Sequence, residues 1–166
     1  MIDLERFNAR SPYKAEPSDI DGFYEFVTDY GVQYQVGFMY DDSIIRENAY
    51  QFIITNVNNE ASPNDDKVRQ AVIIMIDEFF KAKDNILLYI CETGDGKQAM
   101  RNRLFHYWFS LYENFSEFTC LSSSITDMDG VQNFATLIVR NDNKRLTEVI
   151  QEFTETIHLL SSKPED

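Results

Sequence analysis

The arrangement of apolar and polar positions divides the chain into segments typical of strands and segments typical of helices. The most apolar segment is Ile86–Cys91, in which six apolar residues follow one another. This run is too short for a stable helix, and it lacks the alternation of a strand with one face in water. The pattern therefore predicts a strand buried on both faces, and we expect it to be the central strand of a sheet.

Five further segments have the composition of strands, and four of them form two hairpins. Phe23–Thr28 and Val32–Tyr40 are rich in aromatic and β-branched residues and flank an Asp-Tyr-Gly turn. Phe118–Thr126 and Val131–Arg140 flank an Asp-Met-Asp-Gly turn, whose Asp-Gly pair suits the positive φ of tight turns. Three consecutive serines in the first of these two strands indicate a sheet edge or a solvent-facing side. With Tyr50–Val57, the pattern predicts about six strands.

A helix is predicted from Ser62 to about Lys83. Ser62 suits the N-cap, because its hydroxyl can accept a bond from a free backbone amide, and Pro63 suits the first helical position. The run Val72–Ile76 is β-branched and by itself favours a strand. The caps and the helical spacing of the apolar residues decide for the helix.

Two more helices are predicted in the second half of the chain. The first covers about Lys97 to Glu113 and places four apolar residues on one face, which we interpret as a core-facing stripe. These residues are Met100, Leu104, Trp108 and Leu111, with Phe105 and Tyr112 beside them. The second is capped by Asn143 or Asp142 and has the cleanest amphipathic repeat in the chain.

Together these elements predict an α+β fold in a single domain that covers residues 1–166. The expected order from the first hairpin onward is βββαβαββα, and it builds a mixed, largely antiparallel sheet with three helices. Residues 1–21 are expected to form an N-terminal arm, and residues 161–166 a frayed tail. At 166 residues the chain can bury a full core.

The charge and the cysteine content of the chain limit the binding partners and the compartment that we expect. The net charge of -13 disfavours nucleic acid and anionic membrane, because both gain affinity from basic residues. A protein partner remains possible, and the sequence sets no oligomeric state. Cys91 and Cys120 form neither a CxxC motif nor a disulfide framework, so we interpret them as reduced core residues. With neither a signal-like run nor a membrane span in the sequence, we expect a cytoplasmic protein.

The turn after the central strand is the one candidate site. It leads into a helix N-terminus, where free backbone amides can bind an anion. Of the fifteen basic residues, three fall within the seven positions 97–103. These cations either pair with neighbouring carboxylates in a structural network or form an anion or nucleotide pocket. The candidate binding residues are Glu92, Asp95, Lys97, Gln98, Arg101 and Arg103.

No catalytic or metal-binding residue is assigned, and no cofactor is predicted. Gly94–Lys97 lacks the spacing and the following Ser or Thr of a P-loop. An acidic-x-Lys motif, as in Asp95 and Lys97, occurs in metal-dependent nucleases, but the partner acid cannot be placed and the net charge opposes a nucleic-acid groove. Cys91 and His106 have the chemistry of a nucleophile and a base, yet nothing in the sequence places the ring near the thiol.

From the first hairpin to Arg140, the order of elements resembles the second part of the GNAT acyltransferase fold. In that family the turn before the first of its CoA-binding helices has the form Gln/Arg-x-x-Gly-x-Gly/Ala. The corresponding stretch here, Asn58–Val68, has no glycine and contains Glu60, Asp65 and Asp66. The resemblance implies an alternative function, a divergent acyl- or nucleotide-utilising transferase that works at residues 92–103, with acetyl-CoA as its possible cofactor.

Nearly the whole chain resembles a family of uncharacterised small bacterial proteins. The stretches that carry this resemblance are Tyr24–Gly31, Leu87–Thr93, Asp95 with Lys97 and Gln98, Arg101–Phe105, and Trp108 with Phe109. The family implies no activity. We therefore expect a noncatalytic binding or protein-interaction domain rather than an enzyme.

Overall fold

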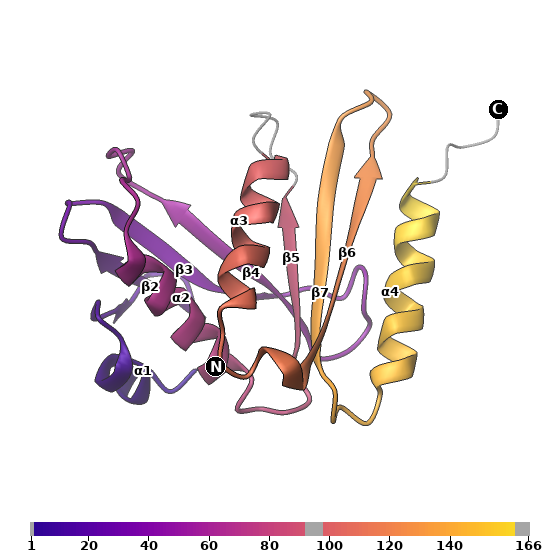
Figure 1. The fold of residues 1–166 in the computed structure, drawn as a ribbon, viewed down its shortest axis with the longest axis horizontal. Helices are drawn as coiled ribbons and strands as arrows, with labels where there is room; N and C mark the ends of the chain where they lie inside the picture. Colours follow the sequence, from indigo (N-terminus) through magenta and orange to yellow (C-terminus); the bar gives the residue numbers. More distant parts are fainter. Residues whose placement is uncertain (1, 92–97, 162–166) are drawn as a thin grey trace. The chain divides into compact units, whose positions relative to one another are not determined.

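The computed structural model describes residues 2–91 and 98–161, which form an α+β structure (Figure 1). Its helices are α1 (Leu4–Arg10), α2 (Asp66–Phe79), α3 (Gln98–Ser110) and α4 (Leu146–Ser161). Its strands are β1 (Glu16–Pro17), β2 (Phe23–Val27), β3 (Gln33–Tyr40), β4 (Ala49–Asn56), β5 (Ile86–Cys91), β6 (Phe118–Thr126) and β7 (Gln132–Arg140). The seven strands form a mixed sheet in the order β1-β2-β3-β4-β5-β7-β6.

The predicted class and the predicted order from β2 to α4 are confirmed, and the element counts were one too low. The extra helix and the extra strand are α1 and β1, which both lie in the segment that we expected to be an arm. Asp3 begins α1 by accepting a hydrogen bond from the amide of Arg6. The two residues of β1 pair with β2, and a strand that short leaves no alternation to detect in the sequence.

The described chain groups into two compact units. The first contains Met1–Met39 and Phe52–Ala82, and the second contains Tyr40–Gln51 and Lys83–Asp166. The boundary falls within β4, whose residues divide between the two units. Whether the chain behaves as the single domain that we expected stays a prediction.

In the first unit, α2 supplies aromatic and aliphatic side chains to the core. The Phe79 ring stacks on Phe38 of β3 with 4.3 Å between the ring centroids. The helix begins later than predicted, because Asp65 rather than Ser62 is its N-cap and accepts a hydrogen bond from the amide of Lys67. The Ser62 hydroxyl lies instead 2.6 Å from the hydroxyl of Tyr34. Aspartate is also a favoured N-cap residue, and Asp65 stands three positions beyond Ser62.

Charged residues connect α1 to α2 within the first unit. The side chain of Glu78 is fully buried, and it accepts hydrogen bonds from Arg6 at 2.7 Å and from Arg10 at 2.8 Å. Arg10 also pairs with Asp77 at 2.8 Å. A buried carboxylate is stable only with such partners, so these ion pairs hold α1 against α2.

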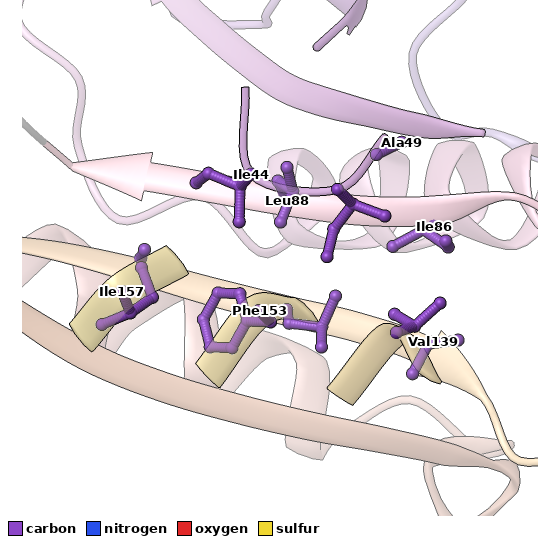
Figure 2. Packing of buried hydrophobic residues seen from close by; sticks show 11 residues of the cluster. Ile44, Ala49, Ile86, Leu88, Val139, Phe153 and Ile157 are labelled. Carbon is purple, nitrogen blue, oxygen red and sulfur yellow. The ribbon is translucent and has the colours of Figure 1, made fainter. Parts of the chain in front are cut away.

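In the second unit, β5 is covered on both faces, as predicted. Ile86, Leu87 and Leu88 have no exposed surface. Alternate residues of β5 point to opposite faces, and Leu88 lies in an apolar cluster with Phe153 of α4 (Figure 2). On the other face, Tyr89 stacks on Phe105 of α3 with 4.1 Å between the ring centroids. Helices α3 and α4 therefore cover opposite faces of this part of the sheet.

The predicted main face of α3 is wrong, whereas Phe105 and Tyr112, which we expected beside it, are buried. Met100, Leu104 and Leu111 are 53%, 46% and 49% exposed, so they do not form a core stripe. The buried face of the helix consists of Asn102, Phe105 and Phe109, and Tyr112 in the turn that follows is also buried. Apolar residues recur at helical spacing on both faces of this aromatic-rich helix, so spacing alone does not select the buried face. Hydrogen bonds that join Asn102 and His106 to the sheet select it.

We expect Ile76→Ala to lower the free energy of unfolding by about 2–4 kcal/mol, because it leaves a cavity at a fully buried position of α2. Ile74→Ala, on the same helix but only partly buried, is the control and should cost less. Urea denaturation measures both. Equal losses in the two variants would contradict the burial seen in the first unit.

Candidate functional site

A group of polar side chains lies between α3 and the sheet in the second unit. His106 of α3 places its Nε2 2.9 Å from the Thr136 hydroxyl of β7. That hydroxyl is also 3.1 Å from the Asn102 carbonyl oxygen and 3.3 Å from the Ser122 hydroxyl of β6. Thr136 is fully buried, so its hydroxyl needs these partners. We call His106, Thr136, Asn102, Ser122 and Cys120 the α3 polar cluster.

The α3 polar cluster contains a thiol beside an imidazole. The Cys120 sulfur lies 3.8 Å from Nδ1 of His106. Burial raises the pKa of Cys120 to about 11, and burial lowers the pKa of His106. Both shifts favour the neutral forms at neutral pH, whereas an activated pair requires a thiolate beside an imidazolium. Cys120 and His106 are therefore the residue types of a nucleophile and a base, but burial disfavours the thiolate and the imidazolium that such a pair needs.

From the sequence, His106 was considered as a base only for the other cysteine, Cys91, and the two were not placed together. In the structure, Cys91 at the end of β5 hydrogen-bonds with Tyr89 and with Arg101, and burial raises the pKa of its thiol. Cys120 and His106 lie fourteen positions apart on different elements, and only the packing of α3 on β6 brings them together. Both cysteines are free, as expected.

The structure describes only part of the predicted site. Glu92, Asp95 and Lys97 lie outside the described residues, and Gln98 begins α3 without a described side chain. Arg101 is partly buried and hydrogen-bonds with Cys91, whereas Arg103 is exposed. Whether residues 92–103 form an anion pocket or an ion-pair network stays a prediction.

A groove of about 400 Å³ runs between β6 and α4 at the edge of the sheet. One face of α4 forms its helical side, where Phe153 and Ile157 are buried and Thr154 and His158 are exposed. Leu121 is partly buried on the strand side. The full lining is Leu121, Ser122, Ser123, Phe153, Thr154, Ile157, His158 and Ser161. Among the described residues, the groove thus has an apolar floor and a rim of hydroxyl groups and one imidazole, without a carboxylate.

The outer edge of β6 is open within the described part of the chain. Glu117 accepts a hydrogen bond from the amide of Asn141, and Asp127 donates its amide to Val131. In an antiparallel pair, residues that bond to the neighbouring strand alternate with residues that point away from it. The register of β6 and β7 therefore aims the backbone groups of Cys120, Ser122, Ser124 and Thr126 away from β7.

Two patterns in the sequence pointed to parts of this site. The serine run was interpreted as an edge or a solvent face, and β6 is indeed the last strand of the sheet. The hydrophobic repeat of α4 predicted its buried face, which contains Val149, Phe153 and Ile157. Neither pattern shows that these two elements leave a groove, because the packing distance between a helix and a strand is not encoded in periodicity.

The second unit of this α+β structure thus has a concave surface whose volume of about 400 Å³ lies in the range of small-ligand sites. The chain belongs to the Family of unknown function (DUF6169), whose model matches residues 64–155. This segment contains most of the groove lining and the whole α3 polar cluster. A search of the curated proteins found no match, and neither did a search of the solved structures. No helix in the described residues has the length and apolar content needed to cross a membrane.

We expect His106 to make the protein less stable as the pH falls below about 6.5. Burial lowers the pKa of the folded ring, so the unfolded chain binds a proton at a pH where the folded chain does not, and acid favours unfolding. His106→Gln should therefore lose less unfolding free energy than the wild type between pH 7.5 and 5.5 in urea titrations. His158→Gln removes the other histidine, which lies on the exposed side of α4 away from the α3 polar cluster, and serves as the control. A full wild-type loss in His106→Gln would refute this role.

We also expect Cys120 to react slowly with iodoacetamide in the folded protein. A pKa of about 11, against about 8.5 for a free thiol, leaves about 300-fold less thiolate at neutral pH. Mass spectrometry of a Cys91→Ser variant isolates the reaction of Cys120, and the same variant in urea gives the unfolded rate. Equal rates in the two states would show that the thiol is not protected.

Proposed function

We propose that this protein is a noncatalytic binding domain of the cytoplasm, and that it binds a segment of another protein in the groove between β6 and α4. One observation carries the proposal: a groove of about 400 Å³ lies directly beside an open strand edge. A protein segment can use both features at once, because its side chains enter the groove while its backbone meets the edge.

The α3 polar cluster supports a noncatalytic role. Its thiol and its imidazole are both driven toward their neutral forms by burial. Its remaining members are hydroxyl and amide groups that hydrogen-bond with one another. Such a network fixes the position of α3 on the sheet, which is a structural role.

The charge of the chain supports a protein ligand over nucleic acid. The chain has 28 acidic and 15 basic residues. Phosphates would be repelled by this excess, whereas the groove presents apolar and hydroxyl groups that suit peptide side chains. The partner itself is not identified by this argument.

One observation favours the alternative, a divergent acyl- or nucleotide-utilising transferase. Helix α3 contains Arg101 and Arg103 and no carboxylate, although acidic residues dominate the rest of the chain. An anion at residues 92–103 would meet this positive helix. Acetyl-CoA, ATP and GTP are therefore the ligands that test the alternative.

The test begins with a display selection of random 12-residue peptides on the immobilised full chain. We expect enriched peptides to lose at least about tenfold in affinity with Thr154→Trp, because the indole fills the groove. Gln151→Trp, on the exposed side of the same helix, is the control and should bind as the wild type. Peptides that are indifferent to Thr154→Trp would refute the groove as the site.

Thermal unfolding with acetyl-CoA, ATP and GTP distinguishes the alternative. A ligand at 100 times its dissociation constant stabilises a protein by about 2.7 kcal/mol. We expect no shift with any of the three compounds. A shift that disappears in an Arg101→Ala variant would replace the binding domain with the transferase.

A further inference from the structure

We propose that the ligand of the groove is an extended segment that joins the sheet as an added strand along β6. In this arrangement the segment has apolar residues at alternate positions and Lys or Arg at its ends. The inference rests on the proposed function and specifies the chemical class and the binding mode of its partner.

The backbone of β6 is prepared for a further strand. The β6–β7 register runs from Phe118↔Arg140 to Thr126↔Gln132 without a bulge. Natural edges are commonly blocked by Pro, by charged side chains or by bulges. The nine residues of β6, FTCLSSSIT, contain neither Pro nor a charge. Cys120, Ser122 and Ser124 therefore present consecutive outward donor and acceptor pairs to an incoming strand.

The side chains of the added strand would alternate between two environments. Side chains directly opposite each other on paired strands point to the same face of the sheet. Leu121 and Ser123 line the groove, so the residues opposite them would point into it, towards Phe153 and Ile157. The intervening residues would lie beside the exposed side chain of Ser122. The residues of the added strand that point into the groove should therefore be apolar, and the intervening residues should be polar.

The charges at the two ends of β6 determine what flanks the added strand. Glu117 precedes the strand, while Asp127 and Asp129 follow it in the hairpin turn. Between Arg103 and Arg140 the sequence contains no Lys or Arg. A segment with basic residues at both ends would meet carboxylates at both ends of the edge, and complementary charge also speeds association.

The same charges oppose a second copy of this chain as the occupant. Antiparallel pairing of two β6 edges about Ser122 would place Asp127 of one copy beside Glu117 of the other. Each copy also has a net charge of -13. Like charges across an interface are unfavourable, so the edge suits a basic partner better than itself.

The experiment uses peptides enriched in the display selection and measures their affinity by fluorescence polarisation. The decisive variant is Ser124→Pro, because proline removes an outward amide and leaves the hydrogen bonds between β6 and β7 in place. The matched control is Ser124→Ala, which keeps the amide. We expect at least about tenfold weaker binding for Ser124→Pro and less than about twofold change for Ser124→Ala. Circular dichroism confirms that both variants fold.

A second measurement modifies the peptide instead of the protein. N-methylation at alternate residues blocks one of the two edges of a strand, so one methylation register should abolish binding and the other should leave it unchanged. Exchange of the terminal Lys or Arg for Glu should weaken binding, and Asp129→Asn in the protein should reduce that penalty. This measurement does not depend on the folding of any β6 variant.

The outcomes separate the inference from the proposed function. Peptides that respond to Thr154→Trp but to neither Ser124→Pro nor N-methylation would leave the groove as the binding site and overturn strand addition. Enriched peptides without alternation or basic ends would overturn the stated chemical class. No enriched peptide that responds to Thr154→Trp would overturn both proposals. A concentration-dependent dimer that Ser124→Pro dissolves would assign the edge to a second copy.

Discussion

The second unit depends on the burial of β5 from both sides. A strand without a wet face requires a helix on each side, and the chain supplies α3 on one face and α4 on the other. The apolar cluster with Phe153 and Ile157 closes the α4 face. The α3 face combines ring stacking with hydrogen bonds around Thr136. The position of the groove follows from this two-sided covering, because α4 packs beside β6, which is the last strand of the sheet among the described residues.

The α3 polar cluster explains why α3 turns a less apolar face to the sheet. The Thr136 hydroxyl of β7 is fully buried, and its burial without a hydrogen-bond partner would destabilise the fold. Asn102 and His106 of α3 are its partners. A rotation of the helix that buried Leu104 would withdraw these partners. Hydrogen bonding therefore determines which face of α3 packs on the sheet, because the burial of apolar area alone would allow either face.

The sequence predicted the elements whose signals are local. Ile86–Cys91 was predicted to the residue, and the turn before β7 has Gly130 at φ +80°, as its Asp-Gly pair indicated. Signals that depend on distant partners failed. The N-cap of α2 is Asp65 instead of the predicted Ser62. The Asp65 carboxylate also accepts a hydrogen bond from the hydroxyl of Tyr13 at 2.6 Å. The contact between Cys120 and His106 and the groove beside β6 likewise depend on tertiary packing, which residue spacing does not contain.

The ion pairs of Glu78 have a consequence for which part of the chain can be separated from the rest. The segment matched by the family model begins at residue 64, so it contains this buried carboxylate but neither Arg6 nor Arg10. A fragment cut to those boundaries would contain the Glu78 carboxylate without the two arginines that pair with it. It would also lack β4, which pairs with β5 in parallel. The limits of recognisable sequence similarity are therefore narrower than the limits of a stable folding unit in this protein.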